Sequence, residues 1–196
     1  MFYGKKKIKM NNFFDDWFIQ ETISNDKVDQ IKNEIEKVII TNNIESNTHL
    51  TSSTGNIDQY NLIHHIGQTY IIDELSELIF NKLQERKLVI KNNELSRQQC
   101  WTVIGNEGSY HTVHSHNASF IKAIVCVFYL EVPEKDHEDI HNRSGNFFMF
   151  SRRNQLMEFS PKVGDFLVFP TWIYHGTYPQ LKGSRQTLNI DYTILT

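Results

Sequence analysis

Two histidines, His114 and His116, stand two residues apart in the segment YHTVHSH, directly before a long run of strand-forming residues. In an extended chain, residues i and i+2 point to the same face, with Cα atoms roughly 6.5–7 Å apart. Two imidazoles placed in this way can share one metal ion, because neutral imidazole is the commonest metal ligand in proteins. The spacing therefore predicts a pair of metal ligands on one face of a strand.

A third histidine, His175, comes much later in the chain, in the segment FPTWIYHG, just past a second apolar run, DFLVFP. Antiparallel strands of one barrel can bring such ends together. We therefore expect His114, His116 and His175 to form a single metal centre. Imidazole ligands suit Fe, Zn, Cu and Ni alike, so the histidines by themselves leave the metal open.

The elements that must position these histidines change type near residue 88. Before it, residues 13–23 are expected to form a strand or extended arm, and apolar residues at helical spacing predict helices at 27–40 and 69–87. The polar stretch 41–56 is predicted to be a loop. After residue 88, period-2 patterns between Gly, Pro and Asn turn signals predict strands. These are 87–91, 98–105, 111–116, 122–132, 146–150, 156–159, 165–169 and 185–194.

This order of elements predicts a mainly β fold. Several short strands after two helices are typical of an antiparallel barrel or jelly roll with a helical cover. The sequence has no internal repeat and no linker long enough to divide domains. We therefore expect one domain over residues 1–196, with residues 1–90 as helical and extended support and residues 91–196 as the β core.

Composition narrows the choice of partner and compartment. Hydrophobic content of 39% and charged content of 22% are those of a soluble globular protein. The net charge of −3 gives no general attraction to nucleic acid, and no apolar stretch reaches the roughly 18–20 residues that a membrane span needs. Cys100 and Cys126 lie in apolar, strand-like segments, which predicts buried free thiols and a cytoplasmic location. The oligomeric state stays open, with a homodimer as one alternative.

The C-terminal half resembles a known family. The motifs Gly108-x5-His114-x-His116 and Gly164-x5-Pro170-x4-His175 are similar to the two halves of the cupin signature. More closely, residues 98–194 resemble the small 2-oxoglutarate/Fe(II)-dependent oxygenases related to the prolyl 4-hydroxylases. The segments that carry this resemblance are YHTVHSH, VFYLEVP, SGNFFMF, PKVGDFLVFPTWIYHGTYP and GSRQTLNIDY.

The resemblance implies a double-stranded β-helix, a cupin-like jelly roll that holds its metal at one mouth. It further implies that His114 and His175 are ligands of Fe(II). Arg185 would be the partner of the distal carboxylate of 2-oxoglutarate, because its planar guanidinium matches a carboxylate.

Arg185 begins a predicted strand with a clean alternation. One face carries polar residues and the other carries apolar ones. The polar residues are Arg185, Thr187, Asn189, Asp191 and Thr193, and the apolar ones are Leu188, Ile190, Tyr192 and Ile194. If the polar face looks into the mouth of the barrel, Arg185 and Thr187 can hold one end of a dicarboxylate, and Tyr129 is a further hydroxyl donor to it. Lys122 is a rival cosubstrate ligand, because its charge in an apolar run needs a partner or an exit to solvent.

The sequence departs from the family pattern at His116, since this class usually has two histidines and one carboxylate. Three neutral imidazoles leave the ion with its full 2+ charge until an anion such as the 2-oxoglutarate dianion binds. A three-histidine site also accepts Zn, which would make it hydrolytic or structural. The Glu of the cupin signature is absent, because Phe120 and Ile121 stand at its place.

The remaining histidines are assigned to other roles. In a regular strand His111 faces opposite to His114, so we expect it at the rim of the site. His64 and His65 are expected as a surface pair. His137 and His141 lie in the polar segment 133–145, which is predicted to be an exposed loop that could act as a lid.

We therefore expect an Fe(II)- and 2-oxoglutarate-dependent dioxygenase that uses O2 to hydroxylate a small molecule or a protein side chain. Its pocket would be lined by aromatic residues: Phe128, Phe148, Phe169 and Trp172. The alternative is a cupin-like metal-binding protein or metalloenzyme that uses the three histidines without 2-oxoglutarate. A third hypothesis is a jelly-roll binding protein without catalysis, in which the histidines are incidental.

Overall fold

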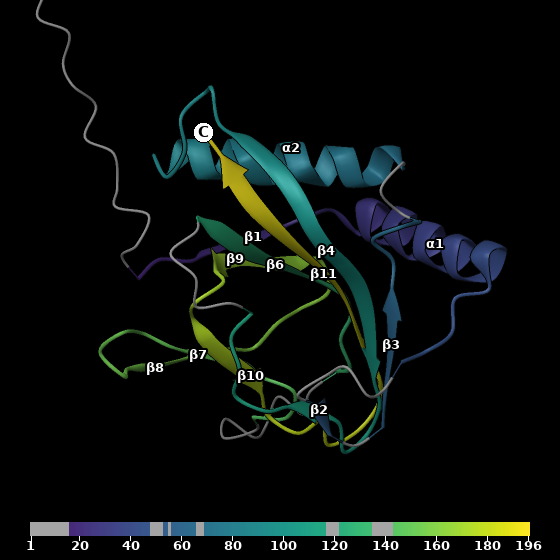
Figure 1. Ribbon diagram of the computed structural model, residues 1–196. Helices are drawn as coiled ribbons and strands as arrows, with labels where there is room; N and C mark the ends of the chain where they lie inside the picture. The colour runs from purple at the N-terminus through teal and green to yellow at the C-terminus, as the bar shows by residue number, and fades with distance from the viewer. Residues whose placement is uncertain (1–15, 48–52, 55, 66–68, 117–121, 135–142) are drawn as a thin grey trace, which may run out of the picture.

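The computed structural model describes residues 16–47, 53–54, 56–65, 69–116, 122–134 and 143–196 (Figure 1). These residues form two helices and eleven strands. In chain order they are β1 (Ile19–Thr22), α1 (Asn25–Asn42), β2 (Ser53–Thr54), β3 (Ile57–Asn61), α2 (Tyr70–Glu85), β4 (Glu94–Gly105), β5 (Tyr110–His111), β6 (Ala123–Glu131), β7 (Phe147–Phe150), β8 (Leu156–Phe159), β9 (Asp165–Pro170), β10 (Tyr174–Thr177) and β11 (Arg185–Leu195).

The strands form one large sheet, one small sheet and a short two-stranded pair. The large sheet has the order β1-β9-β6-β11-β4-β3, the small sheet β10-β7-β8, and the pair is β2-β5. Figure 1 shows α1 and α2 along one side of the large sheet, with β7, β8 and β10 on its other side. This confirms the predicted mainly β fold, a double-stranded β-helix with two helices packed on it.

Alternation along β6 and β11 divides the interior into two apolar clusters. Residues Ile124, Cys126 and Phe128 of β6 turn toward the helices and join the core that contains the buried stripes of α1 and α2. The residues between them, Val125 and Val127, turn toward the small sheet and pack in a second cluster. The helices therefore support the large sheet from outside, and its opposite face is left for the site.

Both predicted helices are confirmed, with small differences at their ends. Ser24 caps α1, because its side chain accepts a hydrogen bond from the backbone N–H of Lys27. The helix ends at Asn43, which takes the left-handed conformation. α2 ends at Glu85, earlier than predicted, since Lys87 has a φ of 60° and cannot continue the helix.

The predicted strand at 87–91 is wrong. This segment forms turns after α2, and the backbone N–H of Leu88 donates to the carbonyl of Leu83. Leu88 and Val89 are buried in the core beside the helices. Their apolar character serves that packing, which a short apolar run does not distinguish from a strand.

Three strands were not predicted, and one further predicted strand is mostly absent. Ser53–Thr54 and Ile57–Asn61 are the strands β2 and β3, where a loop or no element was expected. The segment around His175 is the strand β10, which was not predicted. The predicted strand 111–116 contains only the end of β5 and one isolated bridge at His114.

Both cysteines are free and fully buried, as predicted. No helix among the described residues is long and apolar enough to cross a membrane. The single-domain organisation over residues 1–196 stays a prediction.

Candidate metal centre

A pair of backbone hydrogen bonds brings the two distant parts of the site together. His114 and His175 form an isolated antiparallel bridge, in which each N–H donates to the other's carbonyl at 2.9 Å. Two residues later, the N–H of His116 donates to the carbonyl of Thr171 at 3.0 Å. His114 and His116 are thus fastened to the segment around β10. The segment 111–116 is not the regular strand that was predicted. The side chains of His114 and His116 nevertheless lie close to that of His175, as predicted.

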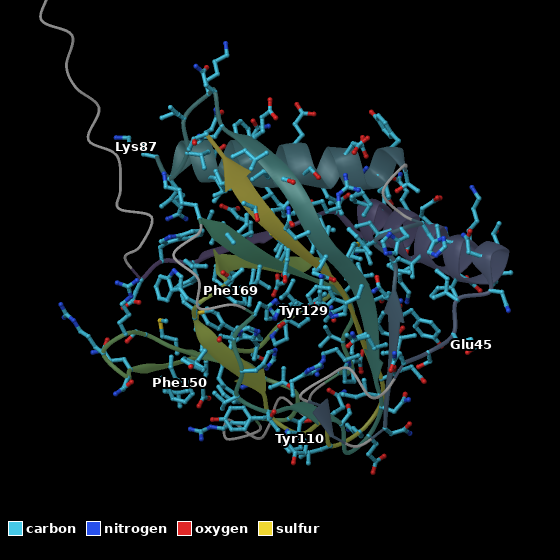
Figure 2. All side chains as sticks on the ribbon, viewed as in Figure 1. Glu45, Lys87, Tyr110, Tyr129, Phe150 and Phe169 are labelled. Atoms are coloured by element: carbon cyan, nitrogen blue, oxygen red, sulfur yellow. The ribbon has the colours of Figure 1, made fainter. Side chains whose placement is uncertain are left out.

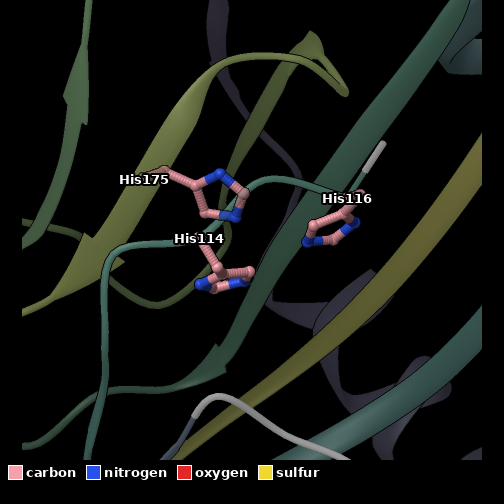
Figure 3. Close-up of side chains that lie close together, drawn as sticks. All are labelled: His114, His116 and His175. Carbon is pink, nitrogen blue, oxygen red and sulfur yellow. The ribbon is translucent and has the colours of Figure 1, made fainter. Parts of the chain in front are cut away.

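The three imidazole rings face one common space (Figure 3). Ring centroids lie 4.4 Å apart for His114 and His175, 5.0 Å for His116 and His175, and 5.4 Å for His114 and His116. One ring nitrogen from each lies within 4.8 Å of the other two. Nitrogens bound at about 2.0–2.1 Å to one ion lie at most about 4.2 Å apart, so small side-chain rotations allow all three to share an ion.

The other ring nitrogen of each histidine is already engaged. The Nδ1 atoms of His114 and His175 lie 2.8 Å and 2.9 Å from the carbonyl oxygens of Thr112 and Ile173. The Nδ1 atom of His116 lies 2.8 Å from a carboxylate oxygen of Asp191. Since these oxygens only accept, each Nδ1 carries the proton and donates. Each Nε2 therefore keeps its lone pair for a metal, the arrangement expected of metal-binding histidines.

Burial favours the form of the histidines that binds metal. His175 is buried, and this burial is the main cause that lowers its pKa well below the usual value, with smaller contributions from His114 and His116. Burial is also the main cause of the lowered pKa of His114. Both rings are consequently neutral at neutral pH, which is the state required of a ligand.

A pocket of about 340 Å³ extends from the three histidines along the inner face of the large sheet. Four residues of β11 line it: Arg185, Thr187, Asn189 and Asp191. Their apolar neighbours Leu188, Ile190, Tyr192 and Ile194 lie in the core toward the helices. The alternation along β11 therefore has the orientation that the sequence predicted, with the polar face in the pocket.

Arg185 is a buried cation in this pocket, with 4% of its surface exposed. Its guanidinium donates to the carbonyl of Gly145 at 2.9 Å and to the hydroxyl of Thr177 at 3.4 Å. Burial lowers its pKa, but an arginine stays charged. Among the residues that the structure describes, no carboxylate forms an ion pair with it. A buried charge without a counter-charge is costly, so this guanidinium is suited to an anionic ligand.

Tyr129 and Thr187 lie beside Arg185 in the pocket and face each other in the pairing of β6 with β11. Figure 2 places Tyr129 on the inner side of the large sheet. Its hydroxyl is buried and has no hydrogen-bond partner among the described residues. Burial raises the pKa of Tyr129, so the hydroxyl stays protonated and can donate. The three residues predicted to bind 2-oxoglutarate are thus neighbours, and their roles stay predictions.

Lys122, the rival cosubstrate ligand, is not among the residues that line the pocket. It lies just before β6, and its carbonyl accepts from the N–H of Ile194 near the end of β11. The arginine at the opposite end of β11 is therefore the better candidate.

The predicted aromatic lining is wrong. Phe128 faces the helices, Phe148 packs on Tyr178, and Trp172 lies under the guanidinium of Arg152. Phe169 lies behind the site, against the edge of His175. Phe147, one position before Phe148, lines the pocket instead, because alternate residues of β7 face opposite sides.

Other residues of the pocket carry no predicted role. Trp101 lies 5.5 Å from His116 between ring centroids, and Gln99 lies two positions before it on β4. Gln59 and Asn61 of β3 complete this polar side. The period-2 pattern of residues 99, 101 and 103 in the predicted strand was the available signal, but β3 itself was not predicted.

The remaining histidines are placed as follows. His111 lines the same pocket, 6.0 Å from the His114 ring, and burial lowers its pKa to about 3, with Arg185 as a smaller cause. It is not one of the three grouped ligands, but it shares the pocket with His114 instead of facing away from it, and its rim position stays a prediction. His64 and His65 are exposed, as expected. His137 and His141 lie outside the described residues.

Part of this chain is similar to a known protein family, and the fold is similar to that of solved structures. Residues 99–191 match the family model described as "Putative 2OG-Fe(II) oxygenase". A search of curated proteins finds no significant match. Among solved structures, a Pseudomonas putida prolyl-4-hydroxylase is 14% identical with a TM-score of 0.65, over 92% of this chain and 94% of that one.

Two further structures share the fold. The viral collagen prolyl hydroxylase of Paramecium Bursaria Chlorella virus-1, in a 2-oxoglutarate complex, is 16% identical with a TM-score of 0.62, over 91% of this chain and 96% of that one. HygX of Streptomyces hygroscopicus, with nickel and 2-oxoglutarate bound, is 12% identical with a TM-score of 0.64, over 92% and 84%. Residues 99–191 are therefore similar to the 2-oxoglutarate- and Fe(II)-dependent oxygenases, and the chain shares the fold of the solved structures named above.

Proposed function

We propose that the chain holds Fe(II) through the Nε2 atoms of His114, His116 and His175 and binds 2-oxoglutarate between that ion and Arg185. With this pair it would use O2 to hydroxylate a C–H bond of a small molecule or a protein side chain. One observation carries the proposal above all others. A buried guanidinium that has no carboxylate partner among the described residues lines the same pocket as three imidazoles of fixed tautomer.

The residues fit both implied groups. Three nitrogen donors from one side leave the other positions of an ion open, as oxygenases of this kind require. The hydroxyl of Tyr129 and the charge of Arg185, which have no hydrogen-bond and no carboxylate partner respectively within the described part of the chain, offer a donor set for one carboxylate. A 2-oxoglutarate dianion would also neutralise the ion held by three neutral rings.

Each residue has a definable task in this reaction. Bound Fe(II) and 2-oxoglutarate supply the reduction of O2, in which one oxygen atom enters succinate, the other enters the substrate, and CO2 leaves. Arg185 and Tyr129 bind and orient the distal carboxylate. The three histidines fix the position of the ion relative to that carboxylate. The apolar side chains of Val127 and Phe147 line the same pocket and reduce the water around these charges.

The alternative, a cupin-like protein that binds metal without 2-oxoglutarate, has no use for Arg185. It would leave a buried positive charge uncompensated inside the pocket, at a cost of several kcal/mol. The hypothesis of incidental histidines leaves unexplained why all three Nδ1 atoms donate to fixed acceptors, while the described residues offer no hydrogen-bond partner to any of the three Nε2 atoms.

The pocket residues on β3 and β4 bear on the choice of substrate. Trp101, Gln99, Gln59 and Asn61 offer one aromatic face and three amide groups, which favours a substrate with its own hydrogen-bonding groups. A solved prolyl hydroxylase of this fold is in complex with a hypoxia inducible factor peptide, and HygX is in complex with hygromycin B, so both a peptide and a small molecule agree with this pocket. We also propose a cytoplasmic location, supported by the two free buried cysteines. The homodimer stays a prediction.

Thermal unfolding in the absence of O2 tests the proposal. Fe(II) should raise the melting temperature, and 2-oxoglutarate at about 100 times its dissociation constant should raise it by about a further 5–10 °C, only when Fe(II) is present. Arg185→Met should keep the Fe(II) shift and lose the 2-oxoglutarate shift. The retained Fe(II) shift shows that this variant folds.

Arg97→Met is the matched control, because Arg97 is paired with Asp73 outside the pocket. It should keep both shifts. An equal 2-oxoglutarate shift in the wild type and in Arg185→Met would refute the assigned role of Arg185.

A further inference from the structure

The three metal-site histidines differ in what their Nδ1 atoms bind. His114 and His175 donate to neutral backbone carbonyls. His116 donates to a carboxylate, with its Nδ1 atom 2.8 Å and 3.0 Å from the two oxygens of Asp191. Only His116, of these three histidines, therefore donates to a negatively charged partner. It is also the residue that stands where this class usually has a carboxylate ligand.

Among the described residues, His116 is the hydrogen-bonded ion-pair partner of Asp191. Both side chains are only 13% exposed. Within the described part of the chain, Asp191 forms no ion pair with lysine or arginine, and the nearby Arg97 is paired with Asp73. Because the pair is largely shielded from water, the charge of this carboxylate interacts strongly with the His116 ring.

The backbone holds this carboxylate in place. Asp191 lies on β11, on the face that lines the pocket, and the pairing of β11 with β4 shifts register directly after it. His116 is fixed by its own backbone hydrogen bond to Thr171. These bonds fix the backbone positions from which the two side chains meet.

We propose that Asp191 is a positioning residue which supplies, through His116, the negative charge that a carboxylate ligand would bring to the ion. The His116–Asp191 pair then acts as one anionic ligand, and with His114 and His175 it gives the site the charge of two histidines and one carboxylate. This inference rests on the proposed metal centre. A carboxylate that accepts from a ligand histidine raises the basicity of the other ring nitrogen, and its loss typically costs 10–100-fold in metal affinity.

Asp191→Asn separates charge from shape. The amide has the size of the carboxylate, and its oxygen can still accept from Nδ1 of His116, so only the charge is removed. We expect this variant to bind Co(II), an air-stable substitute for Fe(II), about 10–100-fold more weakly in competition with a chelator. Asp165→Asn is the matched control, since Asp165 is also buried and lies outside the pocket. It should leave the Co(II) affinity within about twofold of the wild type.

A double-mutant cycle with His116→Asp distinguishes a charge effect from a structural one. In the His116→Asp background, the hydrogen bond from Nδ1 is gone and the residue at position 116 carries its own charge, so Asp191→Asn should lower the Co(II) affinity much less than it does in the wild-type background. A merely structural role for Asp191 would lower the affinity by the same factor in both backgrounds. This difference between the two backgrounds is the expected result.

Three outcomes would overturn the inference, and they differ in what else they affect. If the wild type binds Co(II), and His114→Ala does not, while Asp191→Asn binds as tightly as the wild type, the inference fails and the proposed metal centre stands. If the wild type binds no Co(II), the metal centre fails and the inference fails with it. A loss of affinity of equal size in both backgrounds also rejects the charge role.

Discussion

His114 and His175 lie far apart in the sequence, and each donates its backbone N–H to the carbonyl oxygen of the other at 2.9 Å. Their rings stand 4.4 Å apart between centroids as a direct result. The bridge joins the segment after β5 to β10, which itself pairs with β7. The spacing of the metal-site nitrogens therefore depends on how closely β10 approaches the segment that contains His114.

Gly176 permits this close approach. A Cβ atom there would lie 2.8 Å from the ring of Phe148 and 2.9 Å from the carbonyl oxygen of His111. Since the second contact is with backbone, Gly176→Ala must push β10 outward. We expect a loss of about 1–3 kcal/mol in the free energy of unfolding and a clearly weaker affinity for Co(II). Urea denaturation and a Co(II) titration measure the two effects.

Tyr174→Phe is the control for this experiment, because Tyr174 is on the same strand and 55% exposed. It should leave both the stability and the Co(II) affinity unchanged. Full Co(II) affinity in Gly176→Ala would show that the position of β10 does not set the metal geometry.

Tyr129→Phe removes a buried hydroxyl that has no partner among the described residues. If this hydroxyl donates to 2-oxoglutarate, the loss of a hydrogen bond to a charged group should raise the dissociation constant of 2-oxoglutarate about tenfold or more. The stability of the ligand-free protein should not fall, since no internal hydrogen bond is lost. Calorimetric titration of the anaerobic Fe(II) protein gives the dissociation constant.

Tyr192→Phe provides the opposite pattern and serves as control. The hydroxyl of Tyr192 lies 2.8 Å from that of Ser76, on the helix side of the sheet. Its removal should cost about 1 kcal/mol of stability and leave the affinity for 2-oxoglutarate unchanged. Equal 2-oxoglutarate affinity in Tyr129→Phe and the wild type would remove Tyr129 from the binding site.

Cys100 and Cys126 should stay reduced and unreactive in the folded protein. Each is paired with Ile190, from the two strands on either side of β11, which separates their backbones by about 9–10 Å. This is too far for a disulfide. Burial raises the pKa of Cys100 to about 12 and raises that of Cys126 well above its usual value, so neither forms the reactive thiolate near neutral pH.

The measurement is reaction with a thiol reagent, which should proceed at the rate of global unfolding. Protein unfolded in guanidinium, in which two thiols react at once, is the control. Fast labelling of either cysteine in the native protein would contradict the packing of the core described above.

The strand of Arg185 shows what the sequence could predict. Its alternation from Thr187 to Ile194 is unbroken, so one face had to be apolar and buried, and the polar face followed. The helices were predictable for the same reason, since their apolar stripes have a single period. These long, regular patterns fixed Arg185, Thr187 and the inner face of the sheet.

The surroundings of His114 and His175 show where such patterns fail. β10 is four residues long and contains Gly176, and the segment 112–116 makes a single bridge instead of a ladder. Neither has a period to detect, because their conformation is set by contacts with distant segments. The partnership of His116 with Asp191 depends on the same long-range contacts. The sequence placed Asp191 on the polar face, and only the structure places it beside a metal-site histidine.

Release of labelled CO2 tests the central claim most directly. This claim is that one site for Fe(II) and 2-oxoglutarate is formed by His114, His116, His175 and Arg185. The purified protein is given Fe(II), O2 and 2-oxoglutarate labelled at its C1 carboxylate, with no other substrate added. We expect slow release that requires Fe(II), is matched by succinate, and is lost in His175→Ala and in Arg185→Met. Release by the wild type no greater than that by His175→Ala, with no binding of 2-oxoglutarate to the Fe(II) protein, would contradict it.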